Sequence, residues 1–123
     1  MKKINKKIEE EKIIDATGKA LGRLASEVAV LLLGKNKTSF KRNVYSGVPV
    51  KIVNASKIRF TFKKLEEIVH KRHSGYPGGQ TIITGTEIVE KKGYKELVKH
   101  AIQKMLPDNK LRREMIKNLK IEE

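Results

Sequence analysis

The hydrophobic positions of residues 13–34 follow the spacing of a strand, a turn and a helix. Two isoleucines lead into Asp15, and Gly18 then breaks the extended pattern. Across residues 21–33 apolar side chains recur three or four positions apart, which predicts a helix that buries one face. Gly34 can adopt the left-handed conformation that satisfies the last carbonyl groups, so the helix is predicted to end there.

Shorter apolar runs follow in the middle of the chain. Residues 50–53 form one extended run, and residues 58–62 alternate between apolar and polar side chains, so both are predicted to be strands. Residues 54–57 are too few for a crossover helix, so either a single helical turn links the two strands or they do not pair directly in parallel. Residues 67–72 fit a strand better than a helix, because they lead into the glycine-rich residues 74–79.

The C-terminal half is predicted to be helical. Thr84 and Glu87 have the spacing of a capping box, which indicates the start of a short helix. Residues 94–106 carry one continuous apolar stripe at helical spacing, which predicts a second core helix. A proline then interrupts the pattern, and Asp108 can cap a further short helix over residues 111–116.

The order of these elements predicts an α/β domain with a largely parallel sheet and helices on both faces. A chain of 123 residues suits one domain, and no repeat or linker divides it. We expect residues 1–11 to form a mobile leader of mixed charge, without the apolar stretch of a secretion signal, and residues 12–123 to form the folded domain.

The composition points to a polyanionic partner. The chain has 28 Lys and Arg residues against 14 Asp and Glu residues, a net charge of +14. Such a surplus predicts self-repulsion unless a polyanion supplies the opposite charge. The absence of cysteine excludes disulfides, thiolate metal sites and cysteine nucleophiles, and it favours the reducing cytoplasm. No apolar run is long enough to span a membrane, so no membrane contact is expected.

The positive charge is concentrated in residues 28–65, which contain no Asp or Glu. A solvated surface normally mixes both signs, so this window favours a polyanion-binding surface. Phe40 and Tyr45 lie among the cations, where stacking on bases and packing in the core explain them equally well. The nine cations of the window are Lys35, Lys37, Lys41, Arg42, Lys51, Lys57, Arg59, Lys63 and Lys64.

Residues 74–79 read SGYPGG and directly follow Lys71, Arg72 and His73. Glycines allow the backbone to approach a phosphate closely, and Tyr76 offers a flat face beside them. A plain surface turn is the alternative interpretation. The cations beside the loop favour a nucleic-acid contact.

Other chemistries fit the sequence poorly. His70 and His73 would point to opposite faces of a strand, with no cysteine nearby, so no metal site is predicted. Residues 17–22 form a glycine turn before a helix, but the third glycine and the ribose-binding carboxylate of a dinucleotide site are missing. No catalytic residue and no cofactor are predicted. A small nucleotide-binding enzyme that uses this turn remains the alternative from another class.

Several motifs resemble the bacterial L13 family of large-subunit ribosomal proteins, in the right order and spacing over residues 12–121. They are Asp15-Ala16-Thr17-Gly18-Lys19, Leu21-Gly22-Arg23-Leu24-Ala25, Gly34-Lys35-Asn36-Lys37, Val53-Asn54-Ala55, His73-Ser74-Gly75 with Gly78-Gly79, and Lys104-Met105-Leu106-Pro107. The chain departs from the family's usual pattern at Tyr45, Val48, Phe62, Arg72, Asn109 and Arg112.

The resemblance implies a single three-layer α/β/α domain with a four-stranded, largely parallel sheet. It also implies a structural constituent of the 50S subunit, in the cytoplasm, that binds 23S rRNA early in subunit assembly and contacts neighbouring ribosomal proteins. Neither an enzymatic activity nor a small-molecule substrate is expected. Repression of the chain's own messenger RNA, through the same basic surface, is a further possible role.

The candidate RNA-binding residues combine the basic surface with these motifs. They are Lys19, Arg23, Lys35, Lys37, Lys41, Arg42, Lys63, Lys64, Lys71, Arg72, His73, Gly75, Tyr76, Gly78, Gly79, Lys104, Lys110, Arg112, Arg113 and Lys117.

Overall fold

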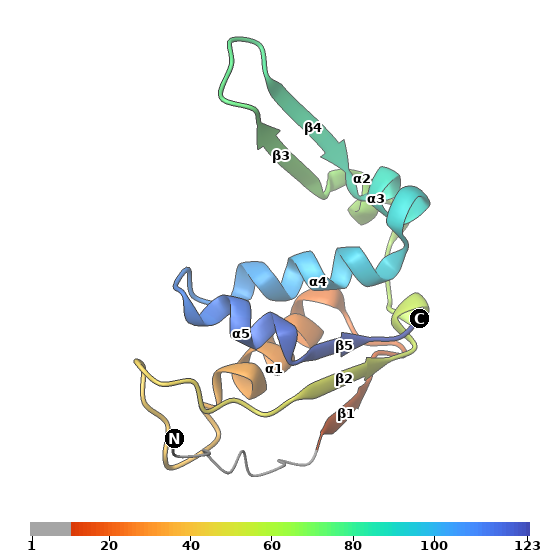
Figure 1. The fold of residues 1–123 in the computed structure, drawn as a ribbon. Coiled ribbons are helices and arrows are strands. Elements are labelled where there is room, and N and C mark those ends of the chain that lie inside the picture. Colours follow the sequence, from red (N-terminus) through yellow and green to blue (C-terminus); the bar gives the residue numbers. More distant parts are fainter. Residues whose placement is uncertain (1–10) are drawn as a thin grey trace.

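The computed structural model describes residues 11–123 (Figure 1). The leader expected over residues 1–11 therefore lies, apart from Glu11, outside the described residues. The strands are β1 (Lys12–Asp15), β2 (Val50–Val53), β3 (Val69–His73), β4 (Gln80–Thr84) and β5 (Leu119–Ile121). The helices are α1 (Leu21–Leu33), the 3-10 turn η1 (Ala55–Lys57), α2 (Phe62–Glu67), α3 (Gly85–Lys92), α4 (Tyr94–Met105) and α5 (Leu111–Lys117).

The main sheet has three parallel strands in the order β1, β2, β5. Ile52 of the central strand is paired with Ile14 on one side and Ile121 on the other. Strands β3 and β4 form a separate antiparallel hairpin. A single mixed α/β domain is thus confirmed, but the prediction of a four-stranded parallel sheet is wrong.

The strand predicted over residues 58–62 is the main reason for this difference. In this segment only Arg59 makes a parallel bridge, to Ala20. The amides of Lys64 and Leu65 donate to the Thr61 carbonyl and start α2, which leaves Phe62 74% exposed. The alternation therefore ends where the helix begins. The single helical turn considered for residues 54–57 is confirmed as η1.

Two strands have no counterpart in the predictions. The three residues of β5 pair with β2. The Val50 amide of β2 also donates a hydrogen bond to the carbonyl of Asn118, just before β5, at 3.0 Å. β4 pairs with β3, which confirms the strand expected near residues 67–72 but makes it part of a hairpin. Pairing partners supply the stability that these short segments lack by themselves.

The core lies on one face of the parallel sheet. Ile14, Val50 and Ile52 are buried and belong to one cluster with residues of α1, α4 and α5. On the alternate face Ile13 is 65% exposed and Lys120 is exposed. Among the described residues no helix covers that face, so the expected three-layer arrangement with helices on both faces is wrong. The described fold has two layers.

Helix α1 is the centre of the core, as its spacing predicted. Leu24, Ala25, Val28 and Leu32 are all fully buried, and α1 packs closely on α4. Gly34 ends the helix with φ 77°, in the left-handed region, and its amide donates to carbonyls of the last turn. The predicted boundaries of this helix are confirmed.

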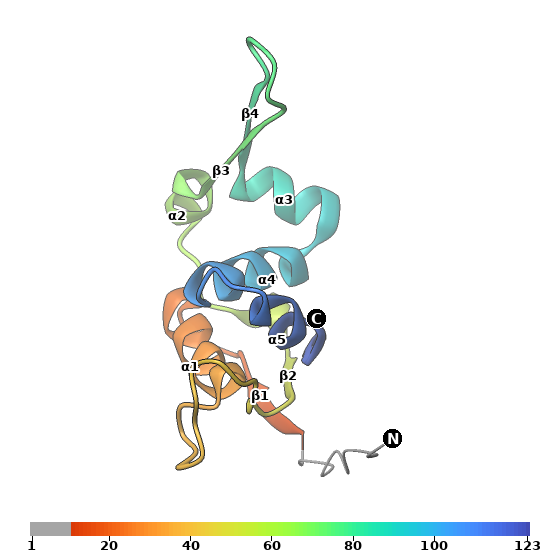
Figure 2. The ribbon, with the colours of Figure 1, turned by 60° about the vertical axis from the view of Figure 1, so that its left-hand side comes forward.

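A smaller apolar cluster attaches the hairpin to the body. Leu65 of α2, Ile88 of α3 and Leu97 of α4 are buried together, with Leu21 and Phe60 packed against them. The predicted cap by Thr84 is confirmed at the start of α3, because its side chain accepts a hydrogen bond from the Glu87 amide at 3.4 Å. The described residues show no return bond from the Glu87 side chain to the Thr84 amide, so the capping box is only half formed. Figure 2 shows the hairpin extending from this base away from the helices.

A carboxylate links the ends of β1 and β2. Asp15 accepts hydrogen bonds from the amide (3.0 Å) and hydroxyl (2.7 Å) of Thr17 and from the side-chain amide of Asn54 (3.1 Å). Asn54 has φ 59°, which brings its side chain to this position. The hydrogen bonds from Thr17 and then from Asn54 lower the pKa of Asp15 to about 2.

This pKa predicts an acid-dependent loss of stability. The folded pKa of about 2 lies below the ordinary value of 3.8, so the carboxylate stabilises the fold fully above pH 4 and this contribution is lost as the pH falls through 2. Asp15→Asn should lower the urea midpoint at pH 7, and the gap to the unmodified chain should narrow towards pH 2.

Urea unfolding followed by circular dichroism between pH 2 and pH 7 measures this gap. Glu114→Gln is the control, because Glu114 is exposed on α5 without an ion pair in the described part of the chain. A difference in urea midpoint between Asp15→Asn and the unmodified chain that is the same at pH 2 and pH 7 would contradict the lowered pKa of Asp15.

Candidate nucleic-acid interface

Two projections of the fold carry seven of the sixteen predicted basic residues. One is the hairpin, residues 69–84, and the other is the basic loop, residues 34–48, which follows α1. Figure 1 shows the hairpin rising above the helices and the basic loop projecting beyond the far end of α1. Apolar side chains at the base of each projection pack against the body of the domain. The backbone that carries the charged side chains is therefore held in place.

The side chains of β3 present the first group of predicted residues. Lys71, Arg72 and His73 are all exposed. The ring nitrogen Nδ1 of His73 accepts a hydrogen bond from the Gly75 amide at 2.9 Å. Nδ1 is therefore unprotonated in the neutral ring, and the hydrogen lies on Nε2. His73 presents that N–H to the surroundings as a donor.

The tip of the hairpin is a tight turn with an exposed aromatic ring. Gly75 and Gly78 have φ values of 91° and 72°, which side chains rarely adopt, so glycine is required at both positions. The Gly79 amide donates to the Tyr76 carbonyl at 3.0 Å and closes the turn. Tyr76 is 76% exposed at its end. The tip can therefore offer backbone and a flat ring to the same ligand.

A groove of about 690 Å³ runs between the base of the hairpin and helices α3 and α4. It brings the predicted Lys71 and Arg72 together with Lys104, which lies far along the chain on α4. It also contains Lys91 and Lys92, which the sequence analysis did not select. Two adjacent lysines at a helix C-terminus have an ordinary explanation as partners of the helix dipole, so only the fold identifies them as part of this groove.

The groove also contains two carboxylates and two imidazoles. Glu87 and Glu96 line it, and Glu96 lies 3.6 Å from Nε2 of His100. The ring of His100 lies 4.8 Å from that of His70. Burial, and then the charge of Lys104, lowers the pKa of His70, which favours the neutral form of this ring.

The basic loop is held at both ends. The Val48 amide donates to the Leu31 carbonyl at 3.2 Å, which returns the loop to the last turn of α1. The Tyr45 hydroxyl accepts a hydrogen bond from the side-chain amide of Asn118 at 2.7 Å. Gly47 packs so closely that an added Cβ would collide with the Leu32 carbonyl. The loop therefore has a defined shape.

Three predicted cations of the basic loop are exposed: Lys35, Lys41 and Arg42. None of them has a carboxylate partner within residues 11–123. Lys37 is half-buried in the same loop. These three residues of the acid-free window thus expose charge that no described carboxylate compensates.

A further basic group surrounds the start of α1. Lys19, Arg23 and Lys64 line a hollow of about 640 Å³ together with Arg59, which was not among the predicted site residues. Nζ of Lys19 already lies 2.9 Å from a Glu27 carboxylate oxygen. Lys63 is exposed on α2 but does not line this hollow.

The predicted residues of the C-terminal region occupy separate surfaces. Lys110 and Arg113 lie with Arg112 around one hollow near the turn between α4 and α5, and Lys117 lies at another that reaches β5. The structure therefore does not gather all predicted residues into one site. It distributes them over the hairpin groove, the basic loop, the start of α1 and α5.

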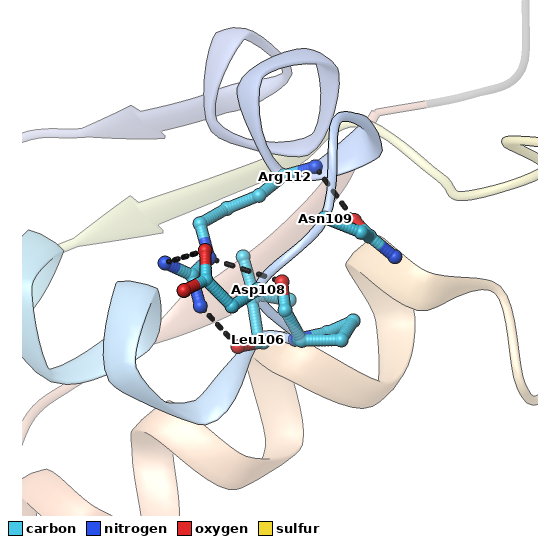
Figure 3. Close-up of polar contacts among 5 residues, drawn as sticks. Leu106, Asp108, Asn109 and Arg112 are labelled. Atoms are coloured by element: carbon cyan, nitrogen blue, oxygen red, sulfur yellow. Dashed lines mark hydrogen bonds and ion pairs between the residues drawn. The ribbon is translucent and has the colours of Figure 1, made fainter.

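Arg112 has partners within its own turn (Figure 3). Its guanidinium donates to the carbonyls of Leu106 and Pro107, each at 3.0 Å, and lies 3.1 Å from a carboxylate oxygen of Asp108. Its amide donates to the Asn109 side chain at 3.2 Å, so the predicted cap by Asp108 is wrong. Arg112 holds the turn between α4 and α5 in shape.

The alternative chemistries receive no support from the described residues. No group of three metal-binding side chains is found there, and no helix among them has the length and apolar character needed to span a membrane. The turn of residues 17–22 does not favour a phosphate, because the Thr17 amide donates to the Asp15 carboxylate instead.

A family model described as ribosomal protein L13 matches residues 9–122. The chain belongs to this family. The resemblance seen in the sequence is thereby confirmed, as is the expectation that the chain is not an enzyme.

Curated relatives agree with the L13 assignment. A large ribosomal subunit protein uL13 of Geobacter sp. (strain M21) is 48% identical over 109 residues, which cover 89% of this chain and 76% of the relative. The proteins of the same name from Symbiobacterium thermophilum and Thermotoga maritima are 47% and 43% identical, over 76% and 72% of their lengths.

The contacts of Arg112 in this L13 chain predict a structural role. Its side chain is only 22% exposed, and Arg112→Gln leaves the two carbonyls without their charged donor. We expect a loss of about 1–3 kcal/mol in the free energy of unfolding. Arg113→Gln, at an exposed neighbour, should change it by less than about 0.5 kcal/mol. Equal stability of the two variants in thermal unfolding would contradict this role.

The packing of Gly47 predicts a second difference between matched variants. Gly47→Ala forces the basic loop away from α1 and should destabilise the fold by about 1–3 kcal/mol. Gly22→Ala, in α1 with no atom within 4 Å of the added Cβ, should stabilise it by about 0.5–1 kcal/mol. Urea unfolding of both variants tests the packing, and a neutral effect of Gly47→Ala would show that the loop is not held there.

Proposed function

We propose that the chain is a structural constituent of the large ribosomal subunit that binds 23S rRNA and supports early assembly of the subunit. Its folded RNA-binding domain comprises residues 12–123. This function implies a cytoplasmic location, in the ribosome, beside other large-subunit proteins. The name of the family and the names of the relatives support the proposal.

The observation that carries the proposal is the placement of unpaired cations on supported projections. Phosphates of folded RNA supply negative charge at intervals that flexible lysine and arginine side chains can follow. The hairpin adds an exposed tyrosine and glycine backbone, which fit an RNA surface by stacking and close approach. Repression of the chain's own messenger RNA would use the same cations, so 23S rRNA would compete with that messenger RNA.

This mode of binding predicts a steep dependence on salt. If roughly six to ten phosphates are neutralised, affinity for 23S rRNA should fall about 10³- to 10⁵-fold between 50 and 200 mM salt. Lys71→Gln and Arg72→Gln should each reduce the slope of log K against log salt by about one.

Filter binding of 23S rRNA at several salt concentrations measures these slopes. Lys51→Gln is the matched control, because Nζ of Lys51 lies 2.6 Å from a Glu122 carboxylate oxygen and is already neutralised. A slope near zero would refute electrostatic binding, and equal slopes for the hairpin variants and the control would remove the hairpin from the interface.

A further inference from the structure

A hollow of about 510 Å³, lined by both apolar and basic side chains, lies between the basic loop and the turn that joins α4 to α5. Buried Leu106 and Met115 contribute to its lining. Phe40, Val44 and Met105 line it as well, and Val44 and Met105 remain 53% and 49% exposed. We call this hollow the loop pocket.

The rim of the loop pocket is positively charged. Lys35, Lys41 and Arg42 line it, and no carboxylate is among the lining residues. An apolar partner alone would leave these three charges uncompensated. The combination therefore selects an occupant with a flat apolar part attached to an anionic backbone.

Backbone hydrogen bonds within the basic loop define the shape of the loop pocket. The amide of Lys37 donates to the Gly34 carbonyl at 3.0 Å, and the amide of Phe40 donates to the Lys37 carbonyl at 3.2 Å. An antiparallel bridge between Lys41 and Val44 then closes the next turn. A preformed site binds with a smaller entropic cost than a disordered loop.

We infer that the loop pocket holds one unstacked base of the rRNA, while the cations at its rim bind the phosphates on either side. A single-stranded base exposes both an apolar face and a charged backbone, which matches the lining and the rim. A volume of about 510 Å³ lies within the range of about 300–1,000 Å³ for small-ligand sites. The inference rests on the proposed rRNA binding and adds a recognition mode that charge alone does not supply.

Tryptophan fluorescence tests the occupant directly, because the chain contains no tryptophan. Phe40→Trp places a single reporter in the loop pocket. Ile13→Trp is the control on the open face of the sheet, where the side chain is 65% exposed. On addition of 23S rRNA at low salt, we expect emission of the Phe40→Trp reporter to be quenched and shielded from acrylamide, with the control unchanged.

The outcomes separate the two proposals. Unchanged emission from Phe40→Trp, while filter binding shows normal affinity, would overturn the pocket inference and leave rRNA binding intact. A response that appears only when other ribosomal proteins are added would assign the pocket to a protein side chain and would also overturn it. Absence of rRNA binding by the unmodified chain would refute the proposed function itself.

A second pair of variants distinguishes stacking from charge. Phe40→Leu keeps an apolar side chain but removes the aromatic face, and we expect affinity to fall on the order of tenfold with an unchanged salt slope. Phe62→Leu, at an aromatic residue that is 74% exposed on α2, should have no effect. Equal affinities for the two variants, both with normal melting temperatures, would overturn the inference.

Discussion

The rest of the structure depends on the burial of α1 between the parallel sheet and α4. Four of its side chains are fully excluded from water, and deleting one such large side chain costs a domain several kcal/mol. The two ends of this helix also hold the two projections. Leu21 packs into the cluster below the hairpin, and Gly34 turns the chain into the basic loop. A rigid centre thus fixes where the positive charges lie.

The charges themselves are kept out of that centre. No charged or polar residue is buried in the described part of the chain, and the core consists of aliphatic side chains and one methionine. The basic side chains of the hairpin and the basic loop gain little from neighbours of the same sign. RNA supplies what the protein lacks, so the same repulsion that limits the stability of the isolated chain favours its binding.

Much of this fold could be predicted from the sequence, and the failures have physical causes. The thirteen residues of α1 give several helical periods, so their spacing located the helix correctly. The three residues of β5 give no period, and they form a strand only because β2 lies beside them. The alternation of residues 58–62 was genuine, but the start of α2 overrode it. The four-stranded sheet was implied by the family resemblance, whereas helices on both faces were predicted from the order of the elements as well. The described residues depart from both.

The candidate interface also has a part that the sequence predicts and a part that only the fold reveals. An acid-free window reveals a basic surface from sequence alone, whereas the groove partners Lys91 and Lys92 depend on how the hairpin packs. Arg112 looked like another surface cation, and only the turn geometry shows that it binds its own backbone.

The central claim is that folded ribosomal RNA compensates the charge of this domain. Sedimentation of the tagged chain from a cell lysate through sucrose gradients tests it most directly. The account predicts that the chain sediments with large ribosomal subunits at low salt and leaves them as salt is raised. A chain that stays at the top of the gradient at low salt would contradict it.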